Sequence, residues 1–261
     1  MTTIDRALAL MELFSESRPA LGLTQLAAMA SYDKATTRRM LMALLRCGYV
    51  EQDRITKEYR LGPAVVRLAR VREATFPISA IAEPVLRKIS EVTGETAHFS
   101  LASGTTLATV GLVESTRAHC VRLEKGESLP LHATASGIAY LAFAPPNVGL
   151  EPQKRLRSFT PKTITDYNKL RTRISTAQRD GWASSAEGYE EGVFGIAAPV
   201  LGADGYAVGA VALAAPASRV DERTEQQFRT LVINAAKQIS RALGGSSRGG
   251  SSKGGLPKVA A

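Results

Sequence analysis

The sequence has few cysteines and no long apolar segment. Only Cys47 and Cys120 occur in 261 residues, and no Cys/His pair has the spacing of a zinc site. We therefore expect neither a disulfide framework nor a structural zinc site, and the composition fits a reducing cytoplasm. No apolar run approaches the roughly 18 residues that a membrane-spanning helix needs. Because Asp5 and Glu12 interrupt the N-terminal apolar residues, we expect no signal peptide and no membrane partner.

Motifs of common enzyme classes are also missing. The chain has no GxSxG elbow and no P-loop. His132 and Ser136 are four residues apart and would fit a nucleophile with its base, but no third member or oxyanion loop accompanies them. Glu187, Glu190 and Glu191 form an acidic cluster without histidines at metal-ligand spacing. We therefore predict that the protein is not an enzyme and that it holds no metal and no cofactor.

Positive charge is concentrated at the two ends of the chain. The formal net charge is +9, and residues 1–75 contain 12 Lys/Arg against 8 Asp/Glu. Residues 76–243 are nearly balanced, with 18 against 16, whereas residues 244–261 carry three positive charges and no acid. A basic segment is typical of proteins that bind a polyanion, although many basic proteins bind none.

Three helical patterns follow one another near the N-terminus. We expect helices over about 4–14, 23–30 and 34–47, and the third helix would begin at Asp33 and end at Gly48. Thr3 is the expected N-cap of the first helix. One apolar face of that helix is expected to carry Ile4, Leu8, Met11 and Phe14.

The start of the third helix is unusually polar and basic. A short helix, a tight turn and a longer helix form a helix-turn-helix, whose second helix places its first turns against base edges and phosphates. On helical pattern alone, a three-helix packing unit with a solvated basic face remains an alternative. The residues predicted to contact DNA in these turns are Lys34, Thr36, Thr37, Arg38 and Arg39.

Two short β-prone runs, residues 49–52 and 58–61, surround a polar turn directly after the third helix. A helix-turn-helix followed by a hairpin is a winged helix, so DNA binding becomes the favoured function. Arg54, Lys57 and Arg60 of the wing are expected to touch adjacent phosphates. The alternative is a small-molecule-binding or enzymatic protein whose winged helix mediates protein contacts.

The rest of the chain predicts a second, larger domain. We expect a linker helix over 64–76, then a helix ending at Gly94 that Pro84 would kink or divide. Alternating residues predict antiparallel strands at 95–103, 105–115 and 119–124, followed by a helix that begins near Ser136. Helices are expected at 152–159, 166–180 and 221–243, and three strands within 181–216. Strands with helices segregated around them indicate an α+β fold class.

The predicted domains are a winged helix-turn-helix at 1–63, the linker helix at 64–76 and an effector-binding domain at 77–243. The Gly/Ser-rich basic tail, residues 244–261, cannot bury a core and is expected to be disordered. Its Arg248, Lys253 and Lys258 would add non-specific attraction to DNA, or the tail would have no function.

With these segments in place, the chain resembles the IclR family of bacterial transcription regulators over about residues 3–243. The resemblance rests on three blocks in order, "LTQLAAMASYDKATTRRMLMALLRCGYVEQD", "LPLHATASGIAYLAF" and "EEGVFGIAAPV…GAVALAAP". It implies a GAF/PAS-like α+β effector-binding domain and a small organic acid effector. It also implies a homodimer or tetramer that binds a pseudo-palindromic operator in double-stranded DNA.

The resemblance also implies an effector pocket. Independently of it, Ser136 lies at a predicted helix start, where free N–H groups favour an anion, although Ser136 would alternatively cap that helix. His98, on an alternating strand, would face the same cavity or simply be packed. The chain departs from the family at Ser31, where a turn usually has glycine. By position, the pocket would be lined by Ala135, Ser136, Ser185, Val193, Gly195, Val211 and Ala212, with Ser185 replacing an acid and Gly195 a cysteine of some relatives.

Taken together, these features predict a cytoplasmic transcriptional regulator, more specifically a repressor, that a small carboxylate controls. Each recognition helix would enter a major groove, and the effector would change the spacing between the two recognition helices of a dimer.

Overall fold

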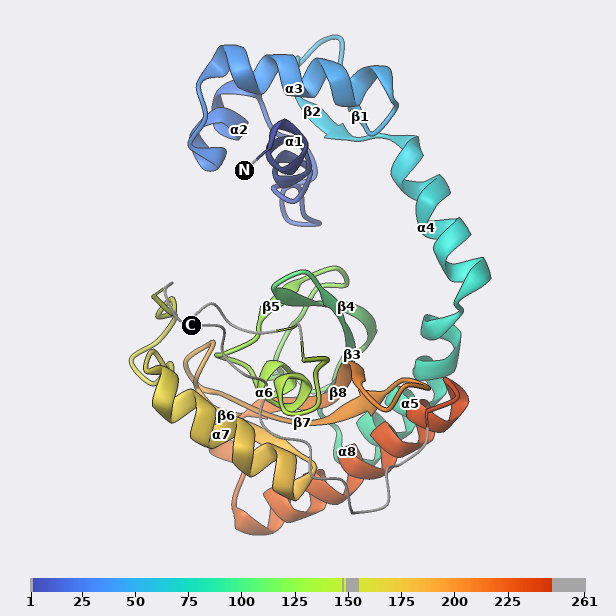
Figure 1. Ribbon diagram of the computed structural model, residues 1–261, viewed down its shortest axis with the longest axis vertical. Coiled ribbons are helices and arrows are strands. Elements are labelled where there is room, and N and C mark those ends of the chain that lie inside the picture. Colours follow the sequence, from blue (N-terminus) through green and yellow to red (C-terminus); the bar gives the residue numbers. More distant parts are fainter. Residues whose placement is uncertain (1, 147, 149–154, 246–261) are drawn as a thin grey trace. The chain divides into compact units, whose positions relative to one another are not determined.

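The computed structural model describes residues 2–146, 148 and 155–245, and the chain divides into two compact units between Pro77 and Ile78. The first unit contains α1 to α4 and a two-stranded hairpin, and the second contains a six-stranded sheet with four α-helices (Figure 1). The charged residues of the predicted tail, Arg248, Lys253 and Lys258, lie outside the described residues.

The first unit is a winged helix-turn-helix. Its β1 and β2 pair antiparallel, with Val50 opposite Leu61, directly after the third helix. Leu10, Leu26 and Leu41, one from each of the first three helices, are fully buried in one core. The elements are α1 (Thr3–Met11), α2 (Leu23–Ala30), α3 (Lys34–Arg46), β1 (Val50–Gln52), β2 (Tyr59–Leu61) and α4 (Pro63–Thr75).

Side chains cap the helices of this unit. The N-cap of α1 is Thr2, not Thr3 as predicted, because the Thr2 hydroxyl accepts a hydrogen bond from the Asp5 N–H at 3.2 Å. The Asp5 carboxylate in turn accepts from the Thr2 N–H, which completes a capping box. Asp33 caps α3, as predicted, by accepting from the Thr36 N–H at 2.7 Å.

The predicted apolar face of α1 is only partly correct. Leu10, which the pattern omitted, is fully buried, whereas Ile4 is 71% exposed and Leu8 is 53% exposed. Met11 and Phe14 pack against the core as expected. Two adjacent apolar stripes run along this helix, and only one of them packs within the described residues of the unit.

Two turns of this unit use the left-handed backbone region. Gly48 ends α3 with a φ of 75°, as the sequence predicts. Ser31, at the end of α2, also adopts a left-handed conformation with a φ of 57°. A side chain is disfavoured there, which explains why a glycine is common at this turn in the family that the sequence resembles.

The second unit is built on one antiparallel sheet with the strand order β5-β4-β3-β8-β7-β6. The contact between β3 and β8, in which His98 lies opposite Ala212, joins two local meanders into this sheet. The elements are α5 (Ile78–Thr93), β3 (Thr96–Ser103), β4 (Thr106–Val113), β5 (Ser128–Pro130), α6 (Ala135–Leu141), α7 (Tyr167–Asp180), β6 (Ala183–Ala186), β7 (Val193–Leu201), β8 (Ala207–Pro216), a 3₁₀ turn (Ala217–Arg219) and α8 (Glu222–Ala242).

Helices cover both faces of this sheet (Figure 1). On one face, α5 and α8 bury Phe99, Leu213 and Val232 in a common core. On the other face, α6 and α7 pack over smaller side chains, with Ile138 and Leu170 buried. The predicted α+β class is confirmed.

Two predictions about this unit are wrong. Residues 119–124 form no strand, because side chains bind their carbonyl groups: Thr96 donates to Val121 O and Arg219 donates to His119 O, both at 2.7 Å. Residues 155–159 form no helix, and residues 152–154 of that predicted segment lie outside the described part. Of the two alternatives for Pro84, division into two helices does not occur, because α5 is a single helix from Ile78 to Thr93. In the part of the chain that is described, no helix is long and apolar enough to span a membrane.

Candidate functional sites

The first candidate site is the exposed start of α3. The side chains of Lys34, Arg38 and Arg39 are exposed there, and Thr36 is half-buried. Thr37 is a correction to the prediction, because it is fully buried and its hydroxyl donates to the Asp33 carbonyl at 2.9 Å. A fully buried side chain whose hydroxyl is bonded to its own backbone in this way cannot reach a base or a phosphate.

A groove of about 550 Å³ separates α3 from the hairpin. Arg38 on one wall and Lys57 on the other bring two positive charges to it, and no carboxylate group is among the described residues that line it. The groove also includes the N-terminus of α2, where Gly22 provides no side-chain cap. Such a groove favours an anion, because two cationic side chains and the N-terminus of a helix border it. Its lining is Gly22, Leu23, Thr24, Gln25, Arg38, Met42, Gln52, Thr56, Lys57 and Tyr59.

The other predicted wing residues differ in their charge environment. Arg54 is exposed at the hairpin turn. Arg60 instead forms an ion pair with Glu51 on the neighbouring strand, with Nε and Oε1 2.5 Å apart. Because Glu51 offsets its charge, we expect Arg60 to contribute less to phosphate binding than Arg54 or Lys57 does.

The second candidate site is a small cavity of about 60 Å³ between the sheet and the start of α6. Seven of the eight predicted ligand-binding residues line it, on β3, α6, β6, β7 and β8. These are His98, Ala135, Ser136, Ser185, Val193, Gly195 and Ala212. Residues that the sequence did not predict complete the lining: Val121, Leu123, Leu129, Ala133, Thr134, Gly188, Tyr189, Glu190 and Ala214.

Val211 is the predicted residue that does not line the cavity. Successive side chains of a strand point to opposite faces, so Val211 and its neighbour Ala212 cannot both face α6. Val211 is fully buried on the side of α5 and α8 and lies opposite Phe99 on β3. Its predicted contact with the ligand is therefore corrected to a role in the core.

His98 and Ser136 meet inside the cavity. Nε2 of His98 lies 3.2 Å from the Ser136 hydroxyl, and both residues are buried. Burial lowers the pKa of His98 to about 4, so the ring is neutral at neutral pH. Nδ1 of His98 is a buried polar atom with no hydrogen-bond partner among the described residues. Such an atom is costly unless a ligand or water completes its bonding.

Two alternative roles for Ser136 are not supported. Thr134, not Ser136, caps α6, because its hydroxyl accepts from the Gly137 N–H at 3.0 Å. His132 does not pair with Ser136, since its Nε2–H donates a hydrogen bond to the Arg157 carbonyl at 2.8 Å. The Ser136 hydroxyl is therefore turned toward His98 and the cavity rather than toward a catalytic base or its own helix.

Polar and acidic groups form one end of the cavity. Tyr189 packs edge-on against Phe159 at 5.0 Å between ring centroids, and its hydroxyl lies 3.5 Å from Oε1 of Glu127. Burial raises the pKa of the Glu127 carboxyl, and the nearby Glu124 and Glu190 add to this effect. The sequence marked Glu190 only as part of an acidic cluster; its position in the cavity depends on a loop that alternation could not predict.

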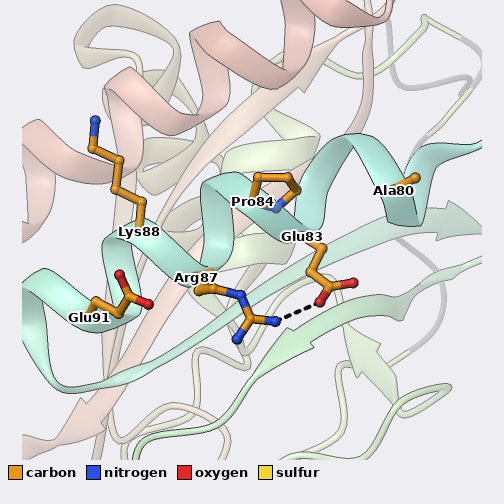
Figure 2. Close-up of a pocket in the computed structure, with 6 residues that line it drawn as sticks. All are labelled: Ala80, Glu83, Pro84, Arg87, Lys88 and Glu91. Carbon is orange, nitrogen blue, oxygen red and sulfur yellow. Dashed lines mark hydrogen bonds and ion pairs between the residues drawn. The ribbon is translucent and has the colours of Figure 1, made fainter.

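A third hollow, of about 330 Å³, lies on the exposed side of α5 (Figure 2). All the residues that line it belong to this one helix, and Glu83 and Arg87 form an ion pair across one helical turn at 2.7 Å. Paired surface charges of this kind need no ligand, so we do not consider this hollow a functional site.

The two units match two models of one protein family. Residues 3–54 match the IclR helix-turn-helix domain, and residues 74–241 match the bacterial transcriptional regulator IclR C-terminal domain. The chain belongs to the IclR family. The regulators of this family bind DNA through the helix-turn-helix domain and small-molecule effectors through the C-terminal domain. The groove beside α3 and the cavity beneath α6 therefore lie in the DNA-binding and effector domains of a transcriptional regulator.

Similarity to individual proteins extends over nearly the whole chain. The HTH-type transcriptional regulator XynR of Escherichia coli K12 is 30% identical over 93% of this chain and 97% of its own length. An IclR transcriptional regulator from Silicibacter sp. TM1040 is 38% identical, covers 94% of this chain and 97% of its own, and has a TM-score of 0.84. An IclR homolog from Microbacterium hydrocarbonoxydans, solved as a complex with 4-hydroxybenzoate, is 22% identical over 92% of this chain and 100% of its own, with a TM-score of 0.71. The curated relatives are named as regulators and repressors, which supports the prediction that the chain is not an enzyme.

Proposed function

We propose that this IclR-family regulator is a cytoplasmic repressor that binds a pseudo-palindromic operator as a homodimer or tetramer and is released by a small carboxylate. The proposed contact with DNA rests on one observation, the groove between α3 and the hairpin that Arg38 and Lys57 line. Repression is supported by relatives such as the transcriptional repressor IclR of Escherichia coli K12, which is 26% identical over 93% of this chain and 90% of its own length.

In this arrangement, α3 enters the major groove and the hairpin follows the sugar-phosphate backbone. A DNA strand that lies in the groove meets Arg38 and Lys57 from two sides. Lys34, Arg39 and Arg54 are exposed around it and extend the positive surface. Phosphate contacts of this kind fix the orientation of the protein on DNA, and contacts with base edges provide the sequence preference.

The test is binding to DNA upstream of the protein's own gene compared with scrambled DNA at two salt concentrations. We expect tight binding to the upstream fragment, and the double variant Arg38→Ala/Arg39→Ala should lose it. Thr37→Val is the matched control, since Thr37 is buried and lacks access to DNA. Unchanged operator affinity in the double variant would contradict the proposed role of α3.

The cavity beneath α6 is proposed to hold the effector. No lysine or arginine is among the described residues that line it, so a carboxylate would be held by the Ser136 hydroxyl and the His98 ring. A cavity of about 60 Å³ admits only a very small molecule without movement of its walls. A carboxylate effector is supported by the IclR homolog of the same fold that was solved as a complex with 4-hydroxybenzoate.

Release of operator DNA by a panel of small carboxylic acids tests this part of the proposal. An acid that releases the wild type should fail to release Ser136→Ala, while both proteins bind the operator equally without the acid. Equal release of both proteins would place the effector elsewhere.

Self-association is proposed to use the exposed apolar side chains of α1 and α4. Leu8 on α1 is 53% exposed, and on α4 Val66 is 58% and Val71 is 55% exposed. A set of large apolar side chains on two helices of a small unit is typical of an interaction surface. A second copy of the chain would cover it and place two α3 helices about one turn of DNA apart, roughly 34 Å.

A further inference from the structure

The turn of the hairpin presents an apolar side chain to solvent. Ile55 is 91% exposed, the highest value among the exposed large hydrophobic residues of the described chain. It lies between two cationic neighbours, Arg54 on one side and Lys57 two residues later. A single exposed isoleucine is not unusual by itself. Its significance depends on how the turn holds it.

Hydrogen bonds fix the backbone of this turn. Oδ1 of Asp53 accepts from the N–H groups of Ile55 and Thr56, both at 2.8 Å. The Lys57 N–H donates to the Asp53 carbonyl at 3.1 Å, and Lys57 adopts a left-handed conformation with a φ of 63°. The Gln52 side chain donates to the Lys57 carbonyl at 2.8 Å. Because the backbone is held from both strands, Ile55 is presented in a preorganised position, and its β-branched side chain has little rotamer freedom to lose.

This turn borders the groove that the proposed function assigns to DNA. Thr56 and Lys57, which directly follow Ile55, line the groove together with Arg38 and Met42 of α3. Ile55 is therefore adjacent to the expected path of the DNA strand and not on a remote surface. Flanking cations would draw the turn to the phosphates on either side of a minor groove, and the isoleucine would reach the sugars and base edges between them.

We propose that Ile55 is an apolar wedge that enters the minor groove beside each half-site and partly unstacks one base step. This inference rests on the proposed DNA binding and adds a specificity-determining residue to it. Insertion of an aliphatic side chain favours steps that open easily, so the operator should carry a pyrimidine–purine step where the turn reaches the DNA. Ile55 would thus add sequence preference without any hydrogen bond to a base.

The experiment uses the full-length protein and an operator selected by the wild type from random DNA. Duplexes carry 2-aminopurine at successive positions flanking each half-site, since this base becomes brighter when it is unstacked. We expect brightening at one step with the wild type and none with Ile55→Ala. The operator affinity of Ile55→Ala should fall roughly 10-fold. Its salt dependence should not change, because the substitution removes apolar contact but no charge. Ile55→Met should retain most of both signals.

Two controls separate failure of the wedge from failure of DNA binding. Val92→Ala removes an apolar side chain that is 54% exposed on α5, in the second unit, and it should behave as the wild type. The double variant Arg38→Ala/Arg39→Ala is expected to lose specific operator binding. If Ile55→Ala then matches the wild type in both operator affinity and 2-aminopurine fluorescence, the proposed insertion of Ile55 is wrong and the proposed function stands. If the wild type selects no sequence, both are wrong.

Discussion

Nε2 of His98 lies 3.2 Å from the hydroxyl of Ser136, which links strand β3 to the first turn of α6 inside the effector domain. The two residues are 38 positions apart in the chain, and the contact forms because His98 lies opposite Ala212 of β8, which packs in the same cluster as α6. Burial lowers the pKa of His98 and keeps the ring neutral, and its Nδ1 has no hydrogen-bond partner among the described residues.

The burial of His98 predicts a pH-dependent stability. The unfolded chain takes up a proton at this residue below about pH 6.5, whereas the folded protein does so only near pH 4. The free energy of unfolding should therefore fall as the pH is lowered between these values and stay level above them. The loss approaches roughly 3 kcal/mol. Urea denaturation at several pH values measures it, and His98→Gln should lack this part of the pH dependence.

Effector binding should be coupled to uptake of a proton. A carboxylate beside His98 favours the charged ring, so the pKa of His98 should rise from about 4 in the complex. Affinity should then increase as the pH is lowered toward 5. Calorimetry in two buffers of different ionisation enthalpy counts the protons taken up. Because Tyr189 and Glu190 also line the cavity and Glu127 lies beside the Tyr189 hydroxyl, His98→Gln is the necessary comparison, and equal proton uptake in this variant would assign the effect to those groups.

Val211 and Ala212 provide a matched pair of variants on one strand. Val211→Ala removes atoms from the packed core beside α5 and α8 and should lower the free energy of unfolding by on the order of 2 kcal/mol, with little change in effector affinity. Ala212→Val fills part of the cavity of about 60 Å³ and should weaken effector binding at least tenfold without a comparable loss of stability. Denaturation and effector titration of both variants measure the two effects. The reverse pattern would show that the faces of β8 are assigned incorrectly.

The turn between α2 and α3 predicts a stabilising substitution. Ser31 has a left-handed φ of 57°, so Ser31→Gly should raise the free energy of unfolding by about 1 kcal/mol. The opposite change at an equivalent backbone position, Gly48→Ala with a φ of 75°, should lower it by a similar amount. Thermal melting of the two variants tests this, and a destabilised Ser31→Gly protein would mean that the Ser31 side chain has an unrecognised contact.

A charge on the exposed side of α4 should separate the subunits. Val71 is 55% exposed, and Val71→Glu would place a carboxylate in the proposed apolar contact between copies. Light scattering should show a smaller assembly than the wild type, and operator affinity should fall because paired half-site contacts are lost. Val92→Glu, on α5, is the matched control and should leave the assembly intact. If Val71→Glu keeps the size of the wild-type assembly, α4 is not the contact.

The sequence by itself determined most of the local structure. Residue patterns predicted the helix-turn-helix, the hairpin, the last helix and the α+β class, because helical spacing, strand alternation and turn residues act over a few neighbouring positions. Residues at helix ends act in the same local way. Asp33, Asp166 and Asp221 cap the starts of α3, α7 and α8, and Gly48 ends α3. Local signals also indicated which polar residues stand at the start of α3.

Only the tertiary structure decided which of the predicted site residues face the sites. Thr37 and Val211 fit their predicted sites by position, but Thr37 is fully buried and Val211 faces the opposite side of the sheet. Tyr189 and Glu190 reach the cavity through a loop whose path depends on distant contacts. The segment 119–124 alternates like a strand but binds side chains instead of a neighbouring strand. Such outcomes depend on which surfaces meet across long stretches of chain, and local periodicity carries no information about those meetings.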